Sequence, residues 1–150
     1  MYKLVAQNKK ARYLFFIEDT FEAGVILKGS EVKSIRKNGM NINESFVSNI
    51  KGDIMLLNSH ISKYDKANIN NHVENRYRKL LLHKREINKV IGKIKMSGYT
   101  MVPLKAYFND RNILKLEIAI AKGKHAADKR QTIKEREWKR EKSQLLKKHE

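Results

Sequence analysis

Apolar and polar positions alternate most regularly in the last third of the chain. Across residues 112–122 the apolar positions are Leu114, Leu116, Ile118 and Ile120. The preceding segment repeats this period at Val102, Leu104, Ala106 and Phe108. A period of two is typical of a strand with one buried face, and the Asn-Asp-Arg-Asn segment at 109–112 favours a turn. The sequence therefore predicts a hairpin over 99–122, with Pro103 at an edge or a bulge.

Shorter apolar segments predict further strands. Residues 13–21 are rich in aromatic and β-branched side chains, residues 46–50 and 54–61 flank a Lys-Gly-Asp turn, and 25–27 form a short apolar run. Several short strands at turn-marked intervals indicate a small antiparallel barrel or sandwich.

Two segments have helical features. In 84–97 the apolar residues recur at helical spacing before Gly98, at Ile87, Val90, Ile91 and Ile94. Residues 30–37 form a shorter candidate, with Ser30 as N-cap, Glu31 in the first turn and Gly39 beyond the end. The Asn-rich segment 65–76 lacks periodicity and predicts a long loop. The expected fold is mainly β, with helices flanking the barrel.

Length, charge and cysteine content narrow the classes of partner that this chain could have. A chain of 150 residues with 41% hydrophobic content suits one domain plus an appendage, and its net charge of +17 favours a polyanionic partner. Nucleic acid is preferred over a membrane, because no myristoylation glycine follows the first residue and no cysteine is available for acylation. Without cysteines, a signal peptide or a long apolar run, we expect a cytoplasmic protein.

The sequence offers little catalytic chemistry. Its five histidines lack metal-site spacing, and each is read as a surface or hydrogen-bonded group. Gly123-Lys124 lacks the remainder of a phosphate-binding loop. We therefore expect no enzyme activity, no metal, no cofactor and no small-molecule substrate. An RNA-processing enzyme and a structural ribosomal protein remain the alternatives to an RNA-binding factor.

Two basic segments adjoin apolar side chains. Lys9, Lys10 and Arg12 precede Tyr13, Phe15 and Phe16, while Arg76, Arg78, Lys79, Lys84 and Arg85 flank the leucines at 80–82. Such segments can hold phosphates while rings stack on exposed bases. The alternative is that the rings and leucines belong to the core and the charges to a solvated face.

Residues 124–150 form a charged, mostly basic tail. Its few large apolar residues do not make a continuous helical stripe, because Ile133 projects about 140° away from Trp138. Pairs such as Glu135 and Lys139 contribute only about 0.2–0.5 kcal/mol each. We expect a tail that is disordered when free and helical on a polyanionic template, the alternative being a tail that only aids solubility.

Seven ordered blocks resemble the SmpB, or SsrA-binding protein, family. They are Asn8-Lys9-Lys10-Ala11-Arg12, Phe16-Ile17-Glu18, Phe21-Glu22-Ala23-Gly24, Glu31-Val32-Lys33-Ser34, Arg78-Lys79-Leu80-Leu81-Leu82-His83-Lys84-Arg85-Glu86, Ala121-Lys122-Gly123-Lys124 and the run from Asp128 to Arg140. The resemblance spans nearly the whole chain.

The resemblance implies an oligonucleotide-binding (OB) type barrel over 1–123 that binds the tRNA-like domain of transfer-messenger RNA. The matching positions are Asn8, Lys10, Arg12, Tyr13, Glu22, Leu81 and His83. Tyr13 stands where some relatives have histidine. We expect the chain to act as a monomer.

For the tail, 124–150, the resemblance implies contact with small-subunit ribosomal RNA at the decoding centre and the vacant mRNA channel of the ribosome. The implied residues are Lys124, Asp128, Lys129, Arg130, Ile133, Lys134, Arg136, Trp138, Lys139 and Arg140. Many relatives have histidine or an aromatic residue immediately before Asp128, where this chain has Ala127.

Overall fold

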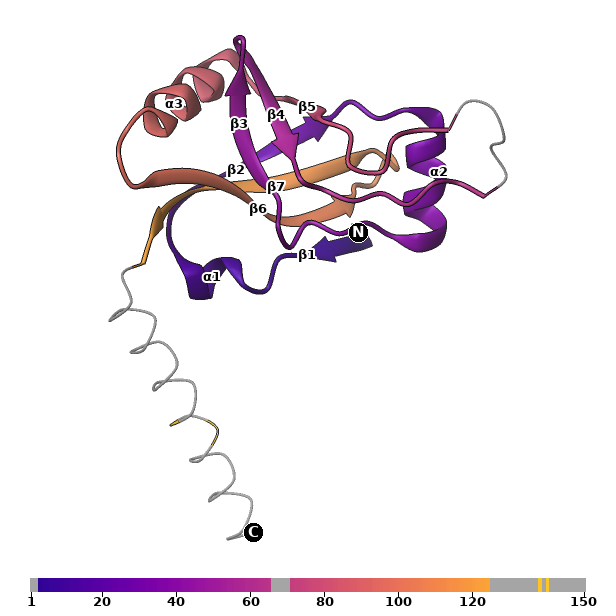
Figure 1. Ribbon diagram of the computed structural model, residues 1–150, viewed down its shortest axis with the longest axis horizontal. Coiled ribbons are helices and arrows are strands. Elements are labelled where there is room, and N and C mark those ends of the chain that lie inside the picture. Colours follow the sequence, from indigo (N-terminus) through magenta and orange to yellow (C-terminus); the bar gives the residue numbers. More distant parts are fainter. Residues whose placement is uncertain (1–2, 66–70, 125–137, 139, 141–150) are drawn as a thin grey trace, which may run out of the picture.

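The computed structural model describes residues 3–65, 71–124, 138 and 140. The elements follow in the order β1 (Lys3–Gln7), α1 (Ala11–Leu14), β2 (Phe15–Val25), α2 (Gly29–Asn38), β3 (Phe46–Ile50), β4 (Asp53–Leu57), β5 (Arg78–Leu81), α3 (Lys84–Ile94), β6 (Tyr99–Phe108) and β7 (Leu114–Gly123). The helices lie around the strands (Figure 1). No helix in the described ranges is long and apolar enough to cross a membrane.

The strands close into an antiparallel barrel. Neighbours pair in the order β6, β3, β4, β5, β2 and β7, and β7 pairs again with β6, which closes the barrel. The strand β1 pairs with the C-terminal half of β6. All of these pairings are antiparallel. The prediction of a mainly β fold, with a small OB-like barrel and flanking helices, is confirmed.

The predicted hairpin is present as β6 and β7. The register of the two strands shifts between Pro103 and Lys105. Since β6 has neighbours on both sides, Pro103 lies at a bulge and not at an edge. An extra residue reverses which positions face inward, so the predicted single alternation is wrong here: Ala106 enters the main core, whereas Val102 packs on the opposite face.

β7 is buried on both faces over much of its length, and not on one face as predicted. Leu116, Ile118 and Ile120 lie in the main core. On the other face Ala119 and Ala121 form a second, smaller cluster with Ala11 of α1. The short helix therefore covers one end of the outer face of the sheet.

Several element boundaries differ from the predictions. The predicted strand at 13–21 begins at Phe15, because Tyr13 and Leu14 belong to α1, and β2 then continues to Val25. β4 ends at Leu57, although Ile61 beyond it is fully buried. α3 ends at Ile94, before the left-handed Gly98.

α2 begins one residue earlier than predicted. Ser30 is not its N-cap: Lys28 occupies that position, and the carboxylate of Glu31 accepts the Lys28 N–H at 2.7 Å. The Ser30 hydroxyl instead lies 2.9 Å from Nδ1 of His72. Gly39 ends the helix with a φ of 76°, a conformation that favours glycine.

A buried ion pair fixes α2 to the strand β5. Oε2 of Glu31 accepts a 2.7 Å hydrogen bond from Nε of Arg78, and both side chains are fully buried. Arg76 donates to the other carboxylate oxygen at 2.6 Å. Arg78 also donates to the hydroxyl of Ser59 and to the Glu74 carbonyl. The predicted role of Arg78 in holding phosphates is therefore wrong, because its guanidinium is enclosed by protein acceptors.

The surroundings of Glu31 keep it ionised. Burial by itself raises the pKa of the carboxyl, but hydrogen bonds from Arg76 and from the Lys28 N–H, together with the charge and hydrogen bond of Arg78, outweigh it, so the pKa lies below its ordinary value.

We expect Glu31→Gln to lower the free energy of unfolding by about 3–5 kcal/mol at neutral pH, because it leaves the Arg78 charge buried without its partner. A depressed carboxyl pKa contributes stability above the unfolded value of about 4.3 and loses it as the pH falls through the folded value. The difference between wild type and variant should therefore shrink in acid. Denaturant unfolding at several pH values measures it.

The matched control is Asp65→Asn, which removes a partner from the exposed pair with Lys37. Surface pairs contribute about 0–1 kcal/mol, so this variant should stay close to wild type. An equally small effect at Glu31 would contradict a stabilising role for the buried pair.

Candidate nucleic-acid interface

A strip of mostly polar side chains lies on the outer face of the barrel. Glu22 of β2 lies opposite Glu117 of β7, and Glu117 lies opposite Lys105 of β6. Lys115 lies opposite both Gly24 and Tyr107, and Gly24 lies opposite Leu81. Directly paired residues project to the same face of a sheet. We call this set the outer strip: Glu22, Leu81, Lys105, Tyr107, Lys115 and Glu117.

Two clefts flank the outer strip. The first, of about 300 Å³, is lined by Gln7, Asn8, Lys9, Arg12, Leu104, Lys105 and Glu117. The second, of about 330 Å³, is lined by Glu22, Gly24, Val25, Leu81, Leu82, His83, Ile113 and Lys115. The strand pair Glu22 and Glu117 connects them. Five of the seven body residues that the resemblance implied therefore lie along one surface.

Asn8 shapes the first cleft from within the protein. Its backbone N–H donates to the Leu104 carbonyl at 2.8 Å, and its side-chain amide donates to the Pro103 carbonyl at 3.1 Å. The side chain is buried. Asn8 thus fixes the segment before α1 to the bulge in β6, while Lys9 of this segment and Arg12 of α1 are exposed.

Hydrogen bonds order the centre of the outer strip. The hydroxyl of Tyr107 donates to the carboxylate of Glu22. Nζ of Lys105 lies 3.5 Å from the carboxylate of Glu117 and 5.8 Å from the centre of the Tyr107 ring. Carboxylates accept hydrogen bonds from base amino groups, and the surrounding cations suit phosphates. The strip can therefore contact both bases and backbone of a nucleic acid.

Two further residues of the second cleft, His83 and Leu81, are positioned by the start of α3 and the end of β5. His83 is the N-cap of α3 and is exposed. Its N–H donates to Glu86 at 3.1 Å, which fixes the start of the helix beside the cleft. Leu81 ends β5 and is 52% exposed, which leaves an apolar contact at the edge of a charged surface.

Not every predicted residue joins this surface. Lys10 and Tyr13 belong to the same segment as Arg12, but in the described part of the chain neither lines either cleft. Sequence reasoning missed Lys105, Tyr107, Lys115 and Glu117 as site residues. The alternation in 112–122 could have indicated the last two, because they are polar positions between buried ones.

Of the implied tail residues, the structure describes Lys124, Trp138 and Arg140. The N–H of Lys124 donates to the Leu14 carbonyl and its Nζ donates to the Arg12 carbonyl, both at 3.1 Å. Trp138 is 66% exposed. The other implied residues, and the expected change from disorder to helix, lie outside the described residues: Asp128, Lys129, Arg130, Ile133, Lys134, Arg136 and Lys139.

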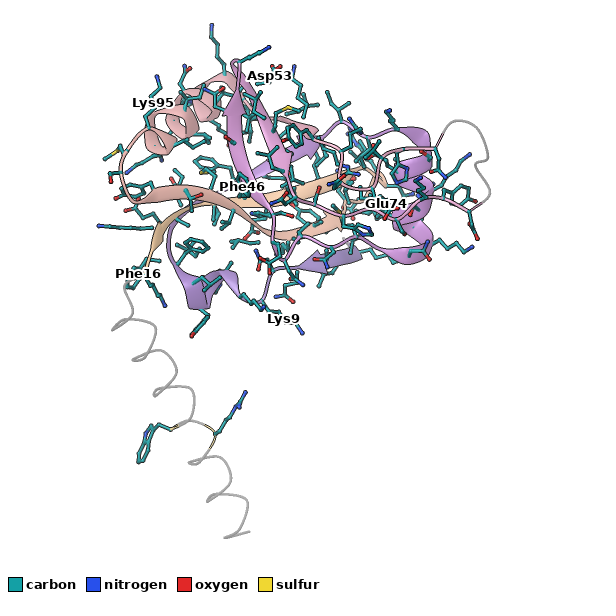
Figure 2. All side chains as sticks on the ribbon, in the orientation of Figure 1. Lys9, Phe16, Phe46, Asp53, Glu74 and Lys95 are labelled. Carbon is teal, nitrogen blue, oxygen red and sulfur yellow. The ribbon has the colours of Figure 1, made fainter. Side chains whose placement is uncertain are left out.

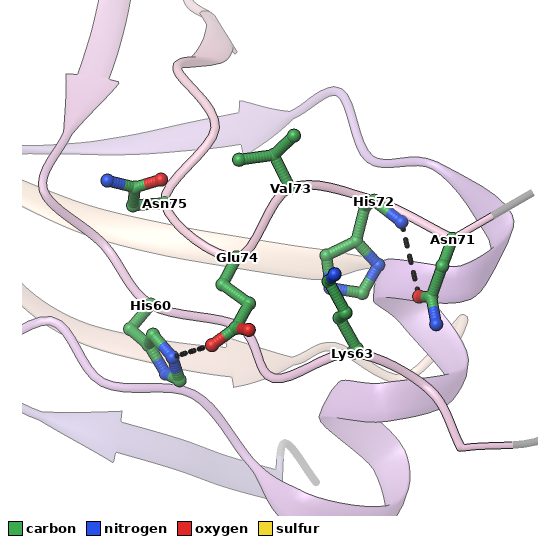
Figure 3. Close-up of a pocket in the computed structure, with 7 residues that line it drawn as sticks. All are labelled: His60, Lys63, Asn71, His72, Val73, Glu74 and Asn75. Carbon is green, nitrogen blue, oxygen red and sulfur yellow. Dashed lines mark hydrogen bonds and ion pairs between the residues drawn. The ribbon is translucent and has the colours of Figure 1, made fainter.

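A larger cleft, of about 700 Å³, lies in the loop between β4 and β5 (Figure 3). Nε2 of His72 donates to the Ile61 carbonyl at 2.9 Å, and Nδ1 lies 2.9 Å from the Ser30 hydroxyl. His60 lies 2.7 Å from Glu74 at the surface. The described residues contain no group of three potential metal ligands. Hydrogen bonding thus accounts for both histidines, one buried and one at the surface.

A closed OB-like barrel with a charged outer strip and basic flanks defines a class of nucleic-acid-binding proteins. The model of the SmpB protein family matches residues 5–148. The chain belongs to the SmpB family.

Relatives in this family match over nearly their full length. The chain is 57% identical to an SsrA-binding protein of Wolbachia pipientis subsp. Culex pipiens (strain wPip), covering 97% of both chains. It is 53% identical to that of Rickettsia bellii (strain OSU 85-389), covering 96% of this chain and 95% of the relative. A solved structure described as "tmRNA-SmpB: a journey to the center of the bacterial ribosome" is 42% identical, with a TM-score of 0.66 over 80% of this chain and 84% of the other.

We expect Asn8→Asp to destabilise the protein by at least about 1–3 kcal/mol, because it replaces the donor to the Pro103 carbonyl with a buried acceptor. Thermal or denaturant unfolding measures the change. Asn43→Asp, at an exposed turn, is the control and should have little effect. A tolerated Asn8→Asp would show that this hydrogen bond does not hold the first cleft.

Proposed function

We propose that this protein binds the tRNA-like domain of transfer-messenger RNA and delivers it to stalled ribosomes for trans-translation. Family membership and the names of the relatives support the proposal. The observation that carries it is the convergence of Asn8, Arg12, Glu22, Leu81 and His83 on one outer surface, although they come from separate parts of the chain.

In this proposal the outer strip and its two clefts form the surface for the tRNA-like domain. Arg12, Lys9 and Lys115 bind phosphates, which fixes the position of the RNA without reading its sequence. Glu22 and Glu117 accept hydrogen bonds from base amino groups or ribose 2′-hydroxyls, and exposed Leu81 adds an apolar contact. Shape recognition by such contacts suits a folded RNA.

The tail performs the second task. Residues 124–150 enter the decoding centre and the empty mRNA channel, where their cations bind ribosomal RNA and Trp138 supplies an apolar anchor. This division gives two functional parts, 1–123 and 124–150. The protein acts as a monomeric adaptor in the cytoplasm, where its ribosomal partner works, and it catalyses no reaction itself.

The double variant Arg12→Ala/His83→Ala should bind the isolated tRNA-like RNA about ten- to a hundredfold more weakly than wild type. The reason is that each of the two substitutions removes a polar group from a different cleft. Fluorescence anisotropy with the labelled RNA measures this. Lys51→Ala with His60→Ala removes the same kinds of group away from both clefts and should change affinity less than about twofold. Comparable losses in both double variants would count against the outer strip as the RNA site.

Truncation after Lys124 should preserve binding of the tRNA-like RNA but abolish peptide tagging on stalled ribosomes. The truncation retains both hydrogen bonds of Lys124, so the end of β7 stays fixed to α1. RNA affinity and tagging in a reconstituted translation system are measured on the same preparation. Parallel loss of the two activities would refute the division of labour.

A further inference from the structure

A pocket of about 190 Å³ lies between α1 and the start of β3, and it shares residues with the small cluster around Ala11. Its walls are largely apolar and include Leu14, Phe15, Phe46 and Val102. Phe46 begins β3 and is 38% exposed, so part of this side chain reaches solvent. Because a cavity of about 150 Å³ holds a benzene ring, the pocket has the size of one aromatic side chain.

Two buried polar atoms of the residues that line this pocket have no hydrogen-bond partner among the described residues. They are Oδ1 of Asn8 and Oγ of Ser45, and the two residues are 8% and 5% exposed. The amide nitrogen of Asn8 donates to the Pro103 carbonyl, so Oδ1 is an acceptor, whereas the Ser45 hydroxyl can donate or accept. Leaving a buried acceptor unpaired costs free energy. The pocket therefore favours an occupant that carries a hydrogen-bond donor.

The chemistry of this pocket suits an apolar ring with a hydrogen-bond donor at its edge. The tryptophan side chain has this form, since its indole N–H donates and does not accept. The large apolar residues of the tail are Ile133, Trp138, Leu145 and Leu146, and of these only Trp138 carries a donor. We call this site the anchor pocket, consisting of Asn8, Leu14, Phe15, Ser45, Phe46 and Val102.

The tail leaves the body beside the anchor pocket. The N–H of Lys124 donates at 3.1 Å to the carbonyl of Leu14, which is one of the pocket residues. Thirteen residues separate Lys124 from Trp138. A chain of that length without regular structure spans about 20 Å on average and gives an effective concentration of about a millimolar. Trp138 can therefore reach the pocket of its own chain, and no second copy is required.

Charges beside the pocket and beside Trp138 are complementary. Glu44 lines the pocket and is exposed. Trp138 is followed directly by Lys139 and Arg140, so seating the indole brings two cations towards a carboxylate. A single anchor also matches the tail, which has no continuous apolar stripe to cover a longer groove.

We propose that in the free protein Trp138 docks into the anchor pocket of its own chain, with its indole N–H donating to Oδ1 of Asn8 and its ring against Phe15 and Phe46. The structure has Trp138 66% exposed, and so it shows the undocked form. The two forms exchange, and docking holds the tail against the body. The docking rests on the pocket and the tail alone, whereas release of Trp138 to the ribosome rests on the proposed function.

The test uses the fluorescence of Trp138, which is the only tryptophan of the chain. Acrylamide quenching is measured on the full-length protein without RNA, for wild type and for Phe46→Ala, which removes one wall of the pocket. The matched control is Phe16→Ala, which changes another exposed phenylalanine that Figure 2 shows elsewhere on the body. A second variant, Glu44→Lys, reverses an exposed charge beside the pocket and leaves its walls unchanged.

We expect the quenching constant of wild type to be at least about twofold lower than that of Phe46→Ala, because a docked population of about half or more shields the indole. The wild-type emission should also lie at shorter wavelength. Phe16→Ala should match wild type, and Glu44→Lys should lie between wild type and Phe46→Ala. In the labelled protein, the single indole N–H resonance should show nuclear Overhauser contacts to the Phe15 ring.

Three results would overturn the proposal. The first is quenching that neither Phe46→Ala nor Glu44→Lys changes. The second is protection of the indole that is lost on dilution, which indicates a second copy as the partner, and the third is protection that appears only after RNA is added. Failure of the wild-type chain to bind the tRNA-like RNA would overturn the proposed function and leave the docking intact, since the measurement contains no RNA.

Discussion

The regular alternation of side chains along β7, between its neighbours β2 and β6, is the constraint on which the other features of this protein depend. β7 has a hydrogen-bonded neighbour on each side, so each of its residues has a fixed direction. Leu116 points into the core, whereas Glu117 next to it points to the outer strip. The same backbone thus stabilises the barrel and positions the surface, which gives the site the rigidity of a sheet.

Local patterns predicted the elements whose signals lie within a few residues. The hairpin, α3 and the glycine end of α2 are of this kind, because alternation, helical spacing and a left-handed glycine act locally. The bulge at Pro103 reverses the inward direction along β6, and no local pattern gives its register. The burial of Arg78 depends on Glu31, which is 47 positions away in sequence. A basic side chain near leucines looks the same in sequence whether it binds phosphate or a buried carboxylate.

The candidate nucleic-acid interface, like the fold, could be predicted from the sequence only in part. The family resemblance gave five residues that the barrel brings to one surface, but it gave no direction for their side chains. Asn8 proves to be buried, and the exposed contacts around it come from Lys9 and Arg12. Lys105 and Tyr107 follow the bulge, so their place on the outer strip could be recognised only once the register of β6 was known.

The acidic centre of the outer strip is unexpected in a chain with a net charge of +17. Glu22 and Glu117 repel phosphates, so an RNA backbone is favoured along the basic rim and disfavoured over the middle of the strip. Such a pattern lowers affinity for an arbitrary polyanion and favours an RNA that presents hydrogen-bond donors between its phosphates. Counting basic residues therefore indicates only that the partner is a polyanion. In the proposed function the two carboxylates, held by Tyr107 and Lys105, restrict which RNA surface fits and in which orientation.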